Sequence, residues 1–178
     1  KLDNFIYDQK LDDLEFVDET VEIIEGHIPI TYNAKVHSII KFFQNQGKVS
    51  IQNWLNRTNR FKKIILPILE QENVPPELFY LAMIESGLNP NAYSYDHASG
   101  VWQFISSTGK MYGLDRSYHI DERLDFEKST RAAAAYLKDL YAEFDDWYLA
   151  FAAYNSGSGR VRKAIRRHGT RDYWKLYS

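Results

Sequence analysis

The sequence contains no cysteine, which excludes disulfide bonds, thiolate metal sites and a cysteine nucleophile. No run of apolar residues approaches the roughly 18 that a membrane-spanning helix needs, so we expect none. The chain starts at Lys1 without a positively charged and apolar leader, and we expect any export signal to have been removed or never to have been present. Proline and glycine are too scarce for a low-complexity linker.

The residues that are present are those of a soluble globular protein. Hydrophobic residues make up 44% and charged residues 26% of the 178 positions, which is far from the composition of a disordered chain. A chain of this length buries roughly 70% of its unfolded surface. The sequence therefore predicts one domain of ordinary size, or at most two small ones.

Charge is distributed unevenly along the chain. Residues 1–30 contain nine acidic and two basic residues, whereas the remainder contains 15 acidic and 20 basic residues. Between Arg160 and Lys175 there are seven arginine and lysine residues and one acidic residue, Asp172. A solvated helix face explains such a cluster, and a surface for an anionic partner is the sharper alternative.

The hydrophobic pattern predicts a mainly α-helical protein. Residues 1–32 show no sustained period, and we interpret them as an irregular N-terminal arm with short runs typical of strands or extended chain. Helical spacing and helix-end signals then place the folded domain at 33–178. The first expected helix runs from a cap at Asn33 to Gly47, and the second starts at a cap at Ser50. A third covers 59–71 and should be kinked at Pro67. The remaining helices are expected over 76–86, 101–111, 127–144, 147–154, 161–168 and 172–177, the last with a cap at Thr170.

Glu85 is the first candidate for chemistry. In the helix over 76–86 it continues an apolar stripe formed by Leu78, Leu81 and Ala82, and it lies in the last turn. Burial and the negative end of the helix dipole both favour a protonated carboxyl, which is the form of a general acid. The alternative is a glutamate that points into solvent or pairs with a lysine.

Two further clusters carry polar groups among apolar neighbours. Gln103 stands between Trp102 and Phe104, where its amide either binds a sugar or is satisfied by a loop carbonyl. Tyr154 and Asn155 end an apolar helix before a glycine-rich turn, a position that suits either a cleft rim or an ordinary helix end.

Other motifs are absent or structural. The five histidines lack the spacing of a metal site, and there is no nucleophile elbow or phosphate-binding loop, so we expect neither metal nor cofactor. Residues 121–123 and Asp125 are interpreted as an ion-pair and capping device before a helix.

Taken in order, these clusters resemble the motifs of lytic murein transglycosylases with a goose-type lysozyme fold, most closely the D group of membrane-bound enzymes. The resemblance runs from Tyr32 to Tyr177. Residues 81–90 (LAMIESGLNP) resemble the Glu-Ser motif and residues 100–104 (GVWQF) the Gly-Leu-Trp/Met-Gln motif. Residues 121–123 and 147–159 resemble the later blocks, with Phe126 and Ser158 standing where proline is usual or frequent.

The resemblance implies a lysozyme-like helical domain that acts on peptidoglycan glycan strands in the bacterial envelope or periplasm. It implies membrane contact only through an anchor outside this chain, and a monomer. We expect no nucleic-acid partner, because no recognised DNA- or RNA-binding motif accompanies the basic residues 160–175. The implied roles are a sole catalytic acid and base for Glu85, substrate contacts near the scissile bond for Ser94 and Gln103, positioning of the glutamate and the sugar for Tyr154 and Asn155, and a place in the groove wall for Tyr136.

The implied reaction needs only one carboxylate. Glu85 would protonate the oxygen between N-acetylmuramic acid and N-acetylglucosamine and then take the proton of the C6 hydroxyl, which closes a 1,6-anhydro ring. Two alternatives remain open. One is a goose-type lysozyme in which Asp96, Asp121 or Asp125 supplies a second carboxylate for hydrolysis, and the other is a non-catalytic wall-binding helical domain.

Overall fold

The computed structural model describes residues 21–23 and 26–177. They divide into two units, one that extends to Gln52 and one that starts at Asn53, and each is described by itself. Residues 1–20, 24 and 25 of the predicted arm, with most of its acidic side chains, lie outside the described residues.

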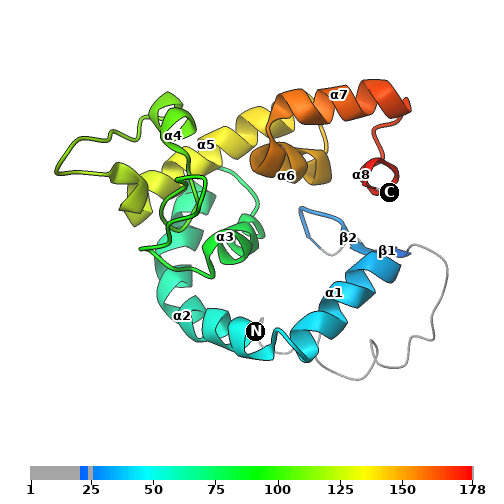
Figure 1. Ribbon diagram of the computed structural model, residues 1–178, viewed down its shortest axis with the longest axis horizontal. Helices are drawn as coiled ribbons and strands as arrows, with labels where there is room; N and C mark the ends of the chain where they lie inside the picture. The colour runs from blue at the N-terminus through cyan, green and yellow to red at the C-terminus, as the bar shows by residue number, and fades with distance from the viewer. Residues whose placement is uncertain (1–20, 24–25, 178) are drawn as a thin grey trace. The chain divides into compact units, whose positions relative to one another are not determined.

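The first unit contains the described strands. β1 (Val21–Ile23) pairs antiparallel with β2 (Ile30–Tyr32), with Glu22 opposite Thr31. This two-stranded sheet is drawn in blue in Figure 1. The short β-branched runs of the arm that fall on described residues thus include two strands.

Helix α1 (Ala34–Gln44) follows the sheet directly. The Asn33 side chain accepts hydrogen bonds from the first free amides of the helix, so the predicted cap is confirmed. The helix ends at Gln44, and Gly47 lies beyond its end.

Helix α2 (Lys48–Gln71) is a single helix, where we predicted two. Ser50 lies inside it and caps nothing, and the helix continues through Pro67, where the kink stays a prediction. The predicted boundary between the two helices before position 59 was wrong, because the buried side chains form one stripe at helical spacing that continues past this position. They are Thr58, Phe61, Ile65, Ile68 and Leu69.

Helix α3 (Leu78–Ser86) ends at Gly87, as predicted. Gly87 has a left-handed backbone with φ of 62°, and a Cβ atom there would lie 2.3 Å from the Trp54 indole nitrogen. Both facts require glycine at this position. The end of α3 is therefore fixed against the side of α2.

The segment after Gly100 was predicted to be helical, and that prediction was wrong for its first half. Gly100 and Gln103 have φ of 80° and 50°, and an α-helix cannot contain such residues. Residues 101–103 form a turn instead, and α4 covers only Ser106–Met111. A Cβ atom at Gly100 would lie 2.0 Å from the carbonyl oxygen of Arg123, so this turn packs directly on another backbone.

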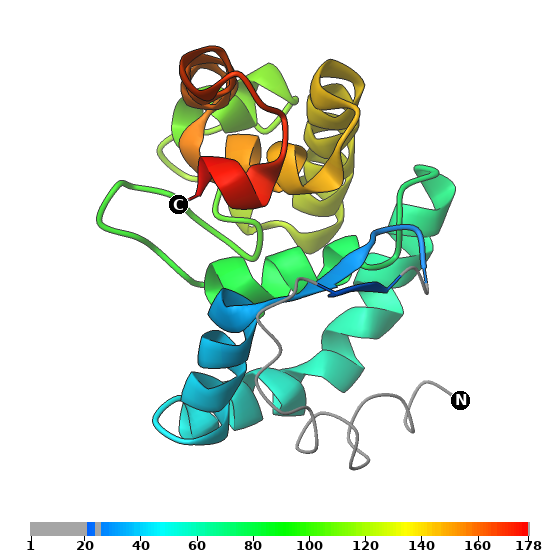
Figure 2. The ribbon, with the colours of Figure 1, turned by 90° about the vertical axis from the view of Figure 1, so that its right-hand side faces the viewer.

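The C-terminal half is built around a long helix. α6 packs against α5 and α7 (Figure 1), and the short α8 lies in front of α6 in Figure 2. Their shared core consists of Leu140, Phe144, Leu149, Ala150, Ala153 and Val161. The elements are η1 (Glu122–Leu124), α5 (Phe126–Phe144), α6 (Trp147–Ser156), α7 (Ser158–His168) and α8 (Tyr173–Leu176).

Aspartate side chains cap these helices. Asp125 accepts from the backbone amide of Lys128 at the start of α5, which confirms its predicted capping role. At α8 the cap is Asp172 and not Thr170, because the Asp172 carboxylate accepts the free amides. Helix α6 continues two residues beyond the predicted end, which places Asn155 in its last turn.

Candidate active site

Glu85 lies in the last turn of α3 with its side chain half-buried. Two residues of the predicted apolar stripe, Leu78 and Ala82, are fully buried in the same helix. Burial raises the pKa of Glu85 above its ordinary value of 4.5, because a low-dielectric surrounding disfavours the charged carboxylate. The side chain is thus biased toward the protonated form that a proton donor needs.

Ser86 connects Glu85 to the 100–103 turn. Its hydroxyl lies 2.8 Å from the carbonyl oxygen of Val101 and donates to it, and it also accepts from the amide of Asn89 at 3.2 Å. Sequence reasoning assigned no role to Ser86, although its place beside the acid in a short motif was the available signal. It fixes the backbone next to Glu85 against the turn.

Tyr154 holds the same turn from the other side. Its hydroxyl donates to the carbonyl oxygen of Trp102 at 2.7 Å, and Trp102 is fully buried. Burial and, secondly, the negative charge of Glu85 raise the pKa of Tyr154 well above its usual value. Glu85 and Tyr154 therefore lie close enough to interact electrostatically, although they are 69 positions apart.

Gln103 is held by two backbone carbonyls. Its amide nitrogen donates to the carbonyl oxygens of Gly100 at 2.8 Å and Ala92 at 3.3 Å. Only the NH₂ group can satisfy two acceptors, so the amide oxygen points the other way. The sequence left open whether the Gln103 amide binds a sugar or is satisfied by a loop carbonyl, and the NH₂ group is satisfied by backbone carbonyls. The amide oxygen is the group that can accept a hydrogen bond from a ligand.

Ser94 lies in the loop over residues 92–99. Its hydroxyl oxygen accepts from the amide of Ala98 at 3.1 Å, and its side chain is half-buried. Because Gln103 bonds to Ala92, this loop and the 100–103 turn form one connected structure. The structure thus links Ser94, Gln103 and Tyr154 through hydrogen bonds around that turn.

Tyr136, on α5, joins the site through aromatic contacts. Its ring centroid lies 5.2 Å from that of Tyr154 and 4.9 Å from that of Tyr112. Burial raises the pKa of Tyr136, with a smaller contribution from Glu143. Asn155 is exposed in the last turn of α6, and none of the contacts recorded among the described residues links it to Glu85.

Two of the three aspartates considered as a second carboxylate have other partners. Asp121 forms an ion pair with Arg123, whose hydrogen bond lowers the pKa of Asp121. Asp125 caps α5, and Asp96 is exposed in the 92–99 loop. The predicted ion-pair and capping device at 121–125 is therefore confirmed.

The basic segment forms one face of α7. Val161 is buried in the core, whereas the cations on the other side of the helix are exposed, and Arg162 forms an ion pair with Glu143 of α5. This is a solvated helix face, as the sequence suggested. The exposed cations are Arg160, Arg162, Lys163, Arg166 and Arg167.

Within residues 21–23 and 26–177 no three or more histidine, aspartate or glutamate side chains are grouped to hold a metal ion. In the same range no helix combines the length and the apolar character needed to cross a bilayer.

Comparisons with known proteins identify the family and the fold of this chain. The profile of the transglycosylase SLT domain matches residues 62–177. Membrane-bound lytic murein transglycosylase D of Escherichia coli (strain K12) is 44% identical over 113 residues, which cover 61% of this chain and 25% of that protein. The chain thus spans about a quarter of the length of that curated relative.

Two solved structures share the fold. The 70 kDa soluble lytic transglycosylase of Escherichia coli is matched with a TM-score of 0.51 and 28% identity, over 64% of this chain and 19% of that one. An inactive mutant of lytic transglycosylase Slt from Pseudomonas aeruginosa is matched with a TM-score of 0.52 and 24% identity, over 64% of this chain and 20% of that one. The chain therefore belongs to the transglycosylase SLT domain family and has the lysozyme-like helical fold of lytic transglycosylases.

Proposed function

We infer that this domain cleaves the β-1,4 bond between N-acetylmuramic acid and N-acetylglucosamine in peptidoglycan, with Glu85 as its only acid and base. The observation that carries the proposal is the half-buried Glu85 with a raised pKa, which interacts electrostatically with Tyr154 and lies next to Ser86, the residue bonded to the turn that carries Gln103. Family membership and the names of the relatives, which are murein transglycosylases, support the substrate class.

The reaction begins with protonated Glu85. The carboxyl gives its proton to the glycosidic oxygen, the bond from that oxygen to C1 of the muramic sugar breaks, and the acetamido carbonyl of the same sugar stabilises C1. Glu85, now a carboxylate, removes the proton of the C6 hydroxyl while O6 bonds to C1. The glutamate ends in its starting state and no water is consumed.

Cyclisation competes with hydrolysis through geometry. Well-placed intramolecular nucleophiles reach effective molarities of about 10⁵–10⁸ M, which is far above any concentration of water. A site with one carboxylate can therefore favour the anhydro product if the sugar is held with C6 near C1. The structural roles of Asp121 and Asp125 support this choice over a hydrolase that uses either of them as its second carboxylate.

The decisive experiment is digestion of purified sacculi with mass spectrometry of the released fragments. We expect muropeptides with 1,6-anhydromuramic ends. A lysozyme-type hydrolase would give reducing ends, heavier by the mass of one water molecule. Binding to sacculi without release of fragments would support the wall-binding alternative and contradict the proposal.

The pH dependence of kcat/KM should report Glu85. Because burial raises its pKa above 4.5, the proton donor persists to higher pH than an ordinary glutamate allows. Above that raised pKa the carboxyl is ionised, and kcat/KM should fall about tenfold per pH unit. Initial rates at constant ionic strength measure this limb, with circular dichroism at each pH as the control for folding. An alkaline limb centred below 4.5 would exclude Glu85 as the titrating acid.

A further inference from the structure

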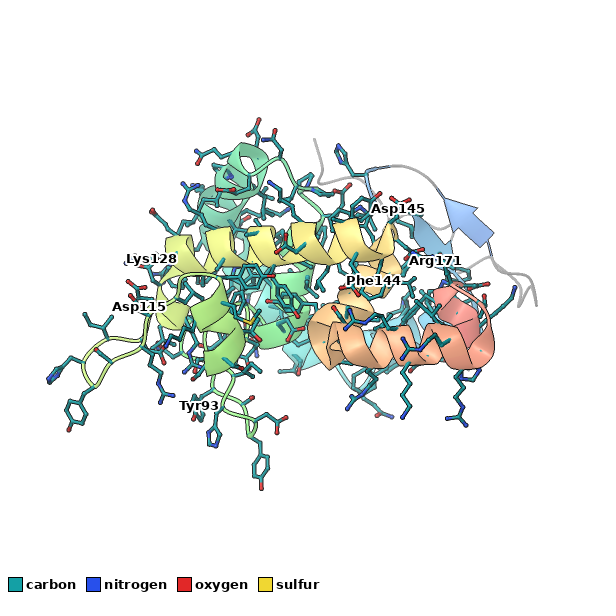
Figure 3. All side chains as sticks on the ribbon, turned by 90° about the horizontal axis from the view of Figure 1, so that it is seen from above. Tyr93, Asp115, Lys128, Phe144, Asp145 and Arg171 are labelled. Atoms are coloured by element: carbon teal, nitrogen blue, oxygen red, sulfur yellow. The ribbon has the colours of Figure 1, made fainter. Side chains whose placement is uncertain are left out.

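The loop over residues 92–99 presents aromatic side chains to solvent. Tyr93 is 60% and Tyr95 97% exposed, and His97 is exposed beside them. With Ser94 they line an open hollow of about 690 Å³. Figure 3 shows Tyr93 on a loop that projects from the helices. A single exposed tyrosine needs no explanation. Three aromatic rings around one hollow, however, form a concave surface that can hold a ligand.

The backbone under these rings is fixed at several points. The amide of Ser94 donates to the Ala98 carbonyl at 2.9 Å, and the Gly100 amide donates to the Ala92 carbonyl at 2.9 Å. The carbonyl of His97 accepts from the fully buried Arg123 at 2.8 Å. Rings on a fixed backbone lose little conformational entropy when a ligand binds. The loop is therefore pre-organised.

The rings also restrain one another. The Tyr93 hydroxyl is hydrogen-bonded to Nδ1 of His97, and their ring centroids are 5.6 Å apart. His97 itself has a left-handed backbone with φ of 62°, a conformation that is uncommon for residues other than glycine. Tyr95 remains the ring with both faces open to a ligand.

The hollow and Glu85 flank the same turn. Ser86, next to Glu85, bonds to Val101 in that turn, and Gln103 bonds from its other end to Ala92, next to Tyr93. A strand that reaches Glu85 can therefore continue to the hollow. Tyrosine suits a sugar ring, because its flat apolar face accepts the C–H groups of the ring and its hydroxyl remains available to polar groups.

We propose that the three rings of this hollow, Tyr93, Tyr95 and His97, form a saccharide subsite that holds a ring of the glycan strand away from the bond being cleaved, with Tyr95 as the stacking residue. The proposal rests on the proposed function, since the strand is the same substrate. A remote subsite adds affinity only for strands long enough to reach it. It therefore makes turnover dependent on glycan length.

The chain offers a matched control. Tyr118 is 96% exposed, almost the same as Tyr95, and it lies in the other projecting loop, which follows Asp115 in Figure 3. Loss of a tyrosine is thus chemically identical at the two positions. Tyr95→Ala and Tyr118→Ala can be compared directly, and Tyr95→Trp restores a stacking face.

The test measures kcat/KM and binding on glycan strands that have been freed of their stem peptides and sorted by length. Binding is measured in the Glu85→Gln background, where strands are not cut. We expect Tyr95→Ala to weaken binding of long strands roughly three- to tenfold, the range of one aromatic stacking contact, with short strands unaffected. Tyr118→Ala should change neither, and Tyr95→Trp should restore binding of long strands.

Each other outcome overturns the subsite. Equal losses on short and long strands, equal losses in the two alanine variants, no loss in Tyr95→Ala, or no binding of peptide-free strands of any length would all contradict it. An effect confined to strands that keep their stem peptides would assign the hollow to peptide. Failure of the proposed function is distinguishable, because the unmodified protein would then release no anhydro product from sacculi.

Discussion

Glu85→Gln is expected to abolish release of muropeptides from sacculi while the domain stays folded and still binds the strand. Glutamine keeps the size and the hydrogen-bonding capacity of the side chain but has no proton to give. One general acid–base group contributes roughly 10²–10⁴-fold to rate, and here the same group serves both proton transfers. We therefore expect turnover of this variant to lie below detection.

The same variant should be at least as stable as the unmodified protein at neutral pH. The raised pKa of Glu85 means that the folded state binds its proton more tightly than the unfolded state does. Ionised Glu85 thus destabilises the fold above its folded pKa, and this cost disappears below the unfolded pKa of about 4.3. Glu85→Gln removes the cost, so its advantage in Tm should be present at pH 7 and vanish in acid.

A suitable comparison is Glu127→Gln, which changes an exposed glutamate in the first turn of α5. It should leave both muropeptide release and the pH dependence of kcat/KM unchanged. If Glu85→Gln released muropeptides as fast as Glu127→Gln does, Glu85 would not be the acid. If Glu85→Gln failed to fold, it would show no cooperative melting transition, and the stability argument above would be wrong.

Local patterns predicted the helix that carries Glu85. The apolar stripe and Gly87 are signals within ten residues, and the structure has the helix end where they place it. The raised pKa of Glu85 also follows from that stripe. The catalytic role stays a prediction, because it concerns a substrate and not the fold.

Longer-range contacts decided the features that local patterns missed. Gln103 has a left-handed backbone, and its side-chain amide donates to a carbonyl 11 residues earlier. Tyr154 meets a carbonyl 52 residues away. The helix propensity of residues 101–111 favours a helix but contains no information on these distant partners. At 101–103 the tertiary contacts therefore outweighed helix propensity. In α2 local patterns divided the segment into two helices, whereas the structure has one, with a buried stripe that continues past position 59.

Arg123 is the clearest case of an interaction that was predicted in kind and not in extent. An ion pair within 121–125 was expected, and the carboxylate of Asp121 does receive two hydrogen bonds from the guanidinium, at 2.8 and 2.6 Å. Arg123 is only 1% exposed, and its remaining donor reaches the carbonyls of His97 and Phe104. One side chain thus fixes the 92–99 loop and the end of the 100–103 turn.

Arg123→Met is therefore expected to lower the free energy of unfolding by at least about 2 kcal/mol, because hydrogen bonds from a charged group contribute about 1.5–3 kcal/mol each. Methionine fills much of the space but removes the donor of the His97 carbonyl and the guanidinium hydrogen bonds to Phe104 and Asp121. Urea unfolding measures the loss. The control is Arg131→Met, which removes an arginine that is 47% exposed and lies 2.8 Å from Glu72. An exposed pair of this kind contributes at most about 1 kcal/mol.

Acid should diminish the difference between the unmodified protein and Arg123→Met. The hydrogen bond from Arg123 holds the pKa of Asp121 below its ordinary value of 3.8. A depressed pKa in the folded state gives stability that is complete above the unfolded pKa and is lost as pH falls through the folded pKa. The contribution of the pair should therefore be constant from neutral pH down to about pH 5 and decline below 4. If Arg123→Met and Arg131→Met destabilised the domain equally, or if the difference grew in acid, the guanidinium would not be the centre that joins the loop to the turn.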